Sequence, residues 1–159
     1  MDFRGKDRPL VNNEERVARF VFEPSMFDDD ILAPSAFELA PKLSSGKPET
    51  YLSVSRMNLF GEITPESYRY KPRVEGDRFC GYAHIEVGTI HSYNQFDTKA
   101  FVLVWPTKDN PAHAGIAILT DSDFAIGGCH TPGYILLTAH LARQSSLVRF
   151  PSPSLPDRP

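Results

Sequence analysis

The stretch FCGYAHIEVG, residues 79–88, alternates its side chains as a half-buried β-strand requires. A strand over 79–87 places Phe79, Gly81, Ala83, Ile85 and Val87 on one face. The opposite face then carries Cys80, Tyr82, His84 and Glu86. The first face suits a hydrophobic core, whereas the second collects polar groups of the kinds used in catalysis and metal binding.

Four further segments have the composition or the alternation of strands. RVARFVF (16–22) is rich in β-branched and aromatic residues, and YLSVSRM (51–57) alternates cleanly. AFVLVWP (100–106) is continuously apolar, which predicts a central strand buried on both faces, with HAGIAIL (113–119) as its neighbour. A helix capped by Asn13 is the alternative for the first of these segments, because two glutamates would follow the cap.

Residues 130–146 carry the strongest helix signal. Thr131 suits the N-cap and Pro132 the first helical position. The apolar positions expected to face the core are Ile135, Leu137, Leu141 and Ala142. A second, short helix is expected to start at Thr64.

These elements predict an α+β fold, a mostly antiparallel sheet of about five strands with the C-terminal helix packed on one face. The 14 prolines predict many proline-rich loops. Residues 1–150 are expected to form a single globular domain, and residues 151–159 a flexible proline-rich tail.

The overall composition limits the classes of function. With 41% hydrophobic and 23% charged residues the chain has the composition of a globular domain. A net charge of −3 argues against a DNA-coating role. Two distant cysteines suit a reducing compartment, and no apolar run reaches the length of a membrane span, so a cytoplasmic protein is predicted. The cofactor stays unknown, since no Walker loop, Rossmann glycine pattern or zinc-ligand motif occurs.

His84 and Glu86 form the first candidate site. Both could reach one metal ion, or Glu86 could orient His84 as a general base. No second ligand pair stands at a diagnostic spacing, so no metal ligands are assigned. The alternative is a water-facing sheet surface, where Tyr82, His84 and Glu86 would serve no special chemistry.

His113 is the second candidate catalytic residue. It stands where a loop becomes a strand and is flanked by alanines, which would let a substrate approach. Histidine is also the side chain most easily tuned near neutral pH. The alternative is a histidine that only hydrogen-bonds the turn preceding it. Cys129, just before the predicted helix, is a further nucleophile candidate, against a plain role in the turn.

Two arginines lie on predicted strands among apolar neighbours. Arg19 shares a face with Val17 and Val21, and Arg56 shares one with Leu52 and Val54. A buried guanidinium needs a partner, which could be a substrate phosphate or a structural carboxylate such as Glu23, Glu38 or Glu62. Arg56, Tyr82 and Arg69 are the predicted substrate-binding residues. Arg69 belongs to SYRYKPR (67–73), whose interleaved rings and cations could meet single-stranded nucleic acid or form a plain solvated segment.

Two hypotheses of function remain. The first is a non-catalytic binding or accessory module that contacts a protein partner or itself, which we expect more than a nucleic-acid partner. The second is a small hydrolase or transferase with a phosphate-bearing substrate, a nucleotide or RNA, in which His113 is general acid or base and His84 with Glu86 a second base. Whether the protein is an enzyme is left open at this point.

Overall fold

The computed structural model describes residues 5, 7–121 and 123–151, and within them eight strands form one antiparallel sheet. The order is β10 (Ser146–Arg149), β5 (Arg78–Glu86), β1 (Arg16–Glu23), β4 (Leu52–Arg56), β8 (His113–Thr120), β7 (Thr98–Val104) and β6 (Asn94–Gln95), with β9 (Asp123–Phe124) beside β8. A small hairpin joins β2 (Phe27–Asp28) and β3 (Ile31–Leu32). The helices are η1 (Pro34–Phe37), α1 (Met57–Phe60), η2 (Pro65–Ser67), α2 (Val87–His91) and α3 (Pro132–Gln144).

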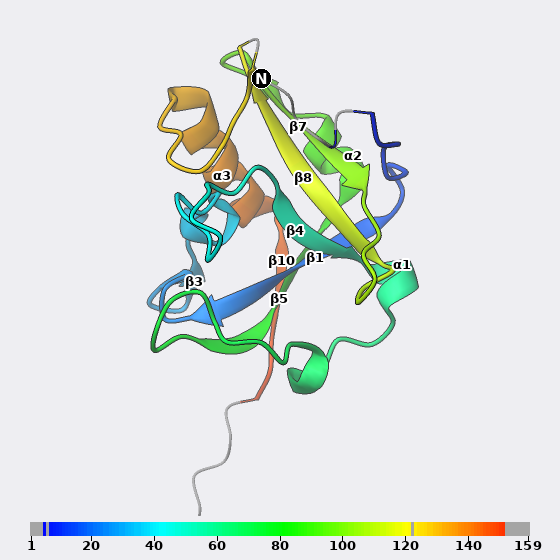
Figure 1. Ribbon diagram of the computed structural model, residues 1–159, viewed down its shortest axis with the longest axis vertical. Coiled ribbons are helices and arrows are strands. Elements are labelled where there is room, and N and C mark those ends of the chain that lie inside the picture. Colours follow the sequence, from blue (N-terminus) through cyan, green and yellow to red (C-terminus); the bar gives the residue numbers. More distant parts are fainter. Residues whose placement is uncertain (1–4, 6, 122, 152–159) are drawn as a thin grey trace, which may run out of the picture.

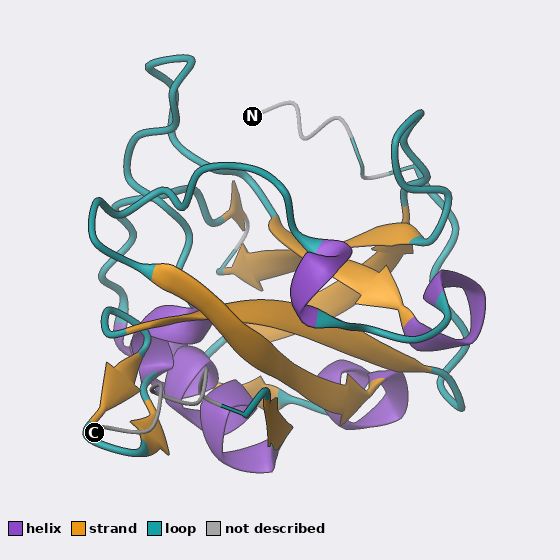
Figure 2. Cartoon of the chain, turned by 90° about the horizontal axis from the view of Figure 1, so that it is seen from below, coloured by secondary structure: helices purple, strands orange, loops and turns teal. Residues whose placement is uncertain are grey.

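The two faces of the sheet are covered differently. The helices α3 and α2 lie on one face, and the long loop that contains η2 crosses the other face (Figures 1 and 2). Leu137 and Leu141 of α3 share a fully buried core with Val17, Val21 and Ile116 of the sheet. The opposite face is covered by loops and aromatic side chains, and it carries the candidate site.

The α+β class, with a large antiparallel sheet and a C-terminal helix, is confirmed. The expected number of about five strands is wrong, because the sheet has eight. The five expected strands correspond to β1, β4, β5, β7 and β8. The additional strands β6, β9 and β10 have two to four residues each, too few for a sequence pattern to indicate them. They exist because longer strands offer them backbone partners.

The segment 100–106 is not the centre of the sheet, as its apolar run predicted. On the side away from β8, β7 pairs with the two-residue β6 and, through one bridge between Leu10 and Leu103, with the segment 9–11. Both of its faces are nevertheless covered, since Val102 belongs to the main core and Leu103 to a second cluster with Ala117. Trp105 packs on that second cluster. The continuous apolar run therefore indicates a strand that is buried on both faces, but not a strand at the centre of the sheet.

A register shift in β5 corrects the face assignment of the stretch at 79–88. Val21 pairs with Gly81 but Phe22 pairs with Phe79, so Cys80 is the extra residue of a β-bulge. Cys80 is buried in the core at 3% exposure, and its thiol lies 3.6 Å from the carbonyl oxygen of Val21. The predicted polar face keeps Tyr82, His84 and Glu86 and loses Cys80.

The helix α3 begins as predicted, with Thr131 as N-cap accepting a hydrogen bond from the Tyr134 N–H, and Pro132 at the first position. Leu137, Leu141 and Ala142 are buried as expected, whereas Ile135 is 52% exposed. The buried face follows Tyr134 at helical spacings of three, four, seven and eight residues, and Ile135 falls outside it. The predicted short helix after Thr64 is confirmed as η2.

No helix among the described residues is long and apolar enough to cross a membrane. The predicted tail lies outside the described residues apart from Pro151, which is exposed.

Leu137→Ala and Ile135→Ala separate the two faces of α3. We expect Leu137→Ala to lower the free energy of unfolding by about 2–5 kcal/mol, because it empties a fully buried position. Ile135→Ala, on the same helix, is expected to change it by less than about 0.5 kcal/mol. Urea denaturation followed by circular dichroism measures both values, and equal losses would contradict this packing of α3.

Candidate functional site

The site begins with a split in the sheet between β1 and β4. β1 pairs with β5 along its whole length, but with β4 only through Val17↔Arg56 and Ala18↔Ser55. Beyond these two pairs the strands separate, and the Arg19 side chain bridges them. Its Nη1 donates to the Ser53 carbonyl at 2.9 Å, and its Nε donates to the Ala36 carbonyl at 2.9 Å. The guanidinium thus gives the Ser53 carbonyl a donor in place of a missing strand pair and ties η1 to the sheet through the Ala36 carbonyl.

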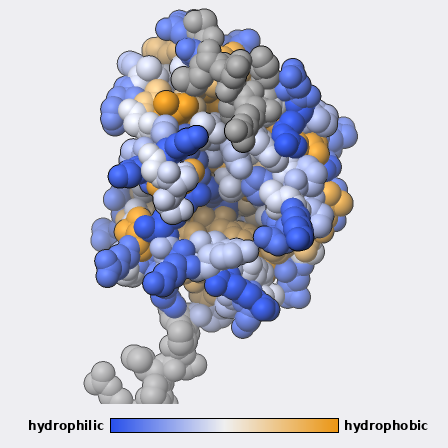
Figure 3. Space-filling view, in the orientation of Figure 1, coloured by the Kyte–Doolittle hydropathy of each residue, from blue (hydrophilic) through white to orange (hydrophobic). Residues whose placement is uncertain are grey.

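A pocket of about 480 Å³ lies over this split. Its floor is the sheet, its outer wall is the loop over residues 67–77, and Phe60 and Asn110 also line it. Figure 3 shows the hollow in the face turned toward the reader, with hydrophobic residues in its depth. The volume is in the range of pockets that hold small organic molecules.

Aromatic side chains form one wall of the pocket. Phe20 and Phe22 rise from β1, and the Tyr68 ring lies against both, with centroids 6.3 and 4.9 Å apart. Phe60 meets the edge of Phe20 at 5.7 Å. Tyr70 extends the wall to the mouth, where it is 69% exposed. A flat, apolar group placed here would be enclosed by ring faces and edges.

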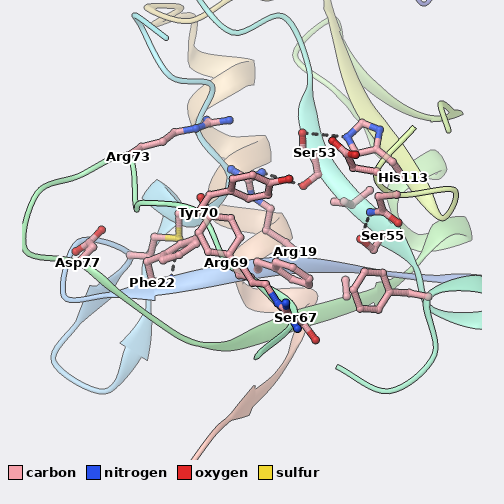
Figure 4. A pocket seen from close by; sticks show the side chains of 18 of the residues that line it. Arg19, Phe22, Ser53, Ser55, Ser67, Arg69, Tyr70, Arg73, Asp77 and His113 are labelled. Carbon is pink, nitrogen blue, oxygen red and sulfur yellow. Dashed lines mark hydrogen bonds between the residues drawn. The ribbon is translucent and has the colours of Figure 1, made fainter. Parts of the chain in front are cut away.

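The opposite end of the pocket is polar and contains a defined hydrogen-bond chain. His113 Nδ1 lies 2.7 Å from the Trp105 carbonyl oxygen, and His113 Nε2 lies 3.1 Å from Ser53 Oγ (Figure 4). A carbonyl oxygen can only accept, so Nδ1 carries the proton and Nε2 of the neutral ring accepts from the serine hydroxyl. Burial lowers the pKa of His113, and the nearby Arg8 charge acts in the same direction, against the bond to Trp105. The neutral form of the ring is therefore favoured, and the electron pair of Nε2 is directed at the Ser53 hydroxyl.

Neighbouring side chains fix the carbonyl that orients His113. Tyr51 stacks on the Trp105 ring at 4.1 Å between centroids, and the Arg8 guanidinium carbon lies 4.3 Å from the same ring. A second polar pair stands next to the first, because Asn110 Nδ2 donates to Ser55 Oγ at 3.1 Å. Ser53 and Ser55 thus share a strand face and a pocket, and each has its own partner.

The charges that line the pocket nearly balance. The arginines are Arg19, Arg69 and Arg73, and the carboxylates are Asp77 and Asp109. Arg73 forms an ion pair of 2.8 Å with the buried Glu49. Burial lowers the pKa of Arg19, and the charge of Glu49 opposes that shift. The pocket suits a ligand that is mostly apolar and carries no more than one negative charge.

The predicted site residues divide between this pocket and other places. His113 and Arg69 line the pocket. His84 is on the same face as His113, because His84, Ala18, Ser55 and His113 are successive cross-strand partners. Three strand spacings separate the two histidines by about 14 Å, so they do not share one pocket.

His84 has its own surroundings. Arg16 Nε donates to His84 Nδ1 at 2.9 Å, and burial together with the Arg16 charge lowers the pKa of His84. Glu86 is the cross-strand partner of Arg16, and Tyr82 is that of Phe20. Neither Glu86 nor Tyr82 lines the pocket.

Arg56 lies outside the pocket. Its Nε and Nη2 donate to the two carboxylate oxygens of Glu15 at 2.9 and 2.8 Å. The hydrogen bond with Glu15 raises the pKa of Arg56 and lowers that of the carboxylate. The partner is therefore a structural carboxylate, although Glu15 is not one of those the sequence suggested.

Ser53, Ser55 and Asn110 are site residues that the sequence analysis did not select. The alternation of 51–57 already placed both serines on the face opposite Leu52 and Val54. No pattern indicated that His113, sixty positions away, would meet one of them. Cys129 packs against the main core with its sulfur 3.6 Å from Thr131 Oγ1, and it does not line the pocket.

Comparisons with known proteins leave the site to be interpreted from its geometry. No known protein family matches the chain, and no curated protein or solved structure is significantly similar to it. Within residues 5, 7–121 and 123–151, no three histidine, cysteine or acidic side chains gather in a group that could hold a metal ion.

Replacing Arg19 by Met tests the bridge across the split. We expect Arg19→Met to lower the free energy of unfolding by about 2–4 kcal/mol, because two buried carbonyls lose their donor and Glu49 loses one of its two neighbouring positive charges. Arg69→Met is the control, since Arg69 is exposed and its Nε makes a long hydrogen bond, 3.4 Å, to the carbonyl oxygen of Glu66. Chemical denaturation of both variants measures the two free energies of unfolding. An Arg19→Met variant as stable as the wild type would refute the bridge.

His113 is expected to make the protein less stable in mild acid. Its folded-state pKa lies below the usual value of about 6.5, so the unfolded chain binds the proton first as the pH falls. The stabilisation present above pH 6.5 is therefore lost below it. Urea titrations at pH 7.5 and 5.5 measure how much the free energy of unfolding falls between the two pH values. This decrease should be smaller in His113→Gln than in the wild type. His130→Gln, at an exposed position, should keep the wild-type loss.

Proposed function

We propose that the protein is a binding module whose pocket holds a small, flat, largely apolar molecule with one polar or singly charged end. The observation that carries this proposal is the two-ended pocket, with rings of Phe20, Phe22 and Tyr68 at one end and Ser53 with His113 at the other. Binding sites of this kind combine apolar enclosure with a few placed polar groups.

The orientation of the ligand follows from the two ends. The flat group lies against the aromatic wall of Phe20, Phe22 and Tyr68, where its burial provides most of the affinity. The polar end points to Ser53, His113 and Asn110, which offer a hydroxyl, an imidazole and an amide. Arg19 is the cation at the floor, next to the Ser53 carbonyl.

The protein partner expected from the sequence stays a prediction. The features that support it are Tyr70 and Val74, which are 69% and 50% exposed at the mouth of the pocket. A partner that docks on this rim would control access to the pocket. Binding of a small molecule and binding of a partner are therefore compatible at this face.

Titration with 2-naphthoate, a flat aromatic carboxylate, tests the proposed pocket. We expect one binding site per chain by isothermal titration calorimetry. Tyr68→Ala should weaken binding about tenfold, because a ring contact is worth about 1 kcal/mol beyond the area it buries. Tyr82→Ala is the matched control, since Tyr82 is on the same sheet face and does not line the pocket.

Three results would count against the pocket as the binding site. They are no saturable binding to the wild type, equal loss in both tyrosine variants, and loss in Tyr82→Ala alone. Melting temperatures of both variants establish that each chain is folded before its affinity is compared.

A further inference from the structure

Ser53 and His113 meet at the polar end of the pocket as a hydroxyl joined to an imidazole. The serine oxygen is 3.1 Å from Nε2, and the other ring nitrogen is held by the Trp105 carbonyl at 2.7 Å. Both side chains are partly exposed and both line the pocket. Hydroxyl, base and a group that orients the base are the three parts that an activated serine nucleophile requires.

From this geometry we infer that Ser53 and His113 hydrolyse a carboxylic ester bound in the pocket, with Ser53 as nucleophile and His113 as base. The inference rests on the proposed function, because the pocket must first hold the flat part of the ester against Tyr68. It adds a reaction to the binding role.

The reaction follows from the positions of the protons. As Ser53 Oγ forms a bond to the ester carbonyl carbon, its proton passes to His113 Nε2. The carbon–oxygen bond to the alcohol then breaks, the oxygen keeps the electron pair, and it takes the proton from Nε2. Water attacks the acyl-serine in the same way, with Nε2 receiving its proton and returning it to Ser53 as the carboxylic acid leaves.

The scaffold supports each role. Ser53 and His113 stand on adjacent strands, β4 and β8, whose pairing fixes their separation. Trp105 holds the proton on Nδ1, so that Nε2 is the nitrogen left to accept. Arg19, which donates to the backbone carbonyl of Ser53, adds a positive charge close to the reacting groups, and that charge favours the negatively charged intermediate without a direct hydrogen bond to it.

A carboxylic ester fits the pocket better than a phosphate ester. A phosphate group calls for cations that are free to meet two negative charges. Arg73 is engaged by Glu49 and Arg19 by two carbonyl oxygens, which leaves the exposed Arg69 as the one less engaged arginine among the three that line the pocket. Arg56, the phosphate clamp expected from the sequence, is bound to Glu15 outside the pocket.

Hydrolysis of 1-naphthyl acetate, followed by fluorescence of 1-naphthol, tests the inference. We expect Ser53→Ala and His113→Gln to lower kcat/KM at least about a hundredfold. Ser146→Ala is the matched control, because Ser146 is the cross-strand partner of another histidine, His84, and does not line the pocket. It should retain most of the activity. Equal activity in the Ser53 and Ser146 variants would overturn the assignment.

A second measurement needs no variant. Diisopropyl fluorophosphate, incubated with the wild-type chain, should attach to Ser53, and mass spectrometry of a peptide digest locates the label. A label on any other residue, or none, would overturn the role of Ser53 even where a variant fails to fold.

The binding proposal and the ester inference fail differently. Ser53→Ala that binds 2-naphthoate but does not turn over the ester supports both. If the wild type binds 2-naphthoate but does not hydrolyse 1-naphthyl acetate, the ester inference is refuted and the binding proposal stands. Hydrolysis of 1-naphthyl phosphate in place of the acetate would overturn the substrate class. A wild type that does not bind 2-naphthoate refutes the proposed function itself.

Discussion

The buried guanidinium of Arg19 is the interaction on which this site depends. Arg19 is 8% exposed and stands where β1 and β4 cease to pair. Its bonds to Ala36 and Ser53 join η1, β1 and β4 across the split. An isolated buried charge would be costly, and here two carbonyl dipoles and the carboxylate of Glu49 offset that cost. A split that would weaken an ordinary sheet thereby becomes the floor of a pocket.

The charge of Arg19 also bears on the loops that form the walls of the pocket, through the neighbouring carboxylate of Glu49. Glu49 accepts from the Ala40 N–H at 3.0 Å and from Arg73 at 2.8 Å, so it ties two loops to the position of Arg19. Arg73 belongs to the loop that carries Tyr68 and Tyr70 over the sheet. The alternation of arginine and carboxylate from floor to rim keeps the local charge near zero. The cavity can therefore remain largely apolar although three arginines line it.

The polar end is organised by packing. The stack of Tyr51 on Trp105 lies over Gly115, where an added Cβ would approach the Tyr51 ring to 2.9 Å. Absence of a side chain at that position lets the ring lie close to β8 and holds Trp105, whose carbonyl orients His113. Aromatic packing thus decides which nitrogen of His113 faces Ser53, and burial favours the neutral form of the ring.

Local patterns in the sequence determined the α+β class, the five longer strands and the C-terminal helix, because alternation and capping act over a few residues. They did not give β6, β9 and β10, whose existence depends on backbone partners, nor the bulge that turns Cys80 into the core. His113 could be selected from its place at the start of a strand. That it meets Ser53, and that His84 stands three strand spacings away, followed only from the strand order. Contacts between residues far apart in the chain depend on the order in which the strands pair, and a local sequence pattern does not predict that order.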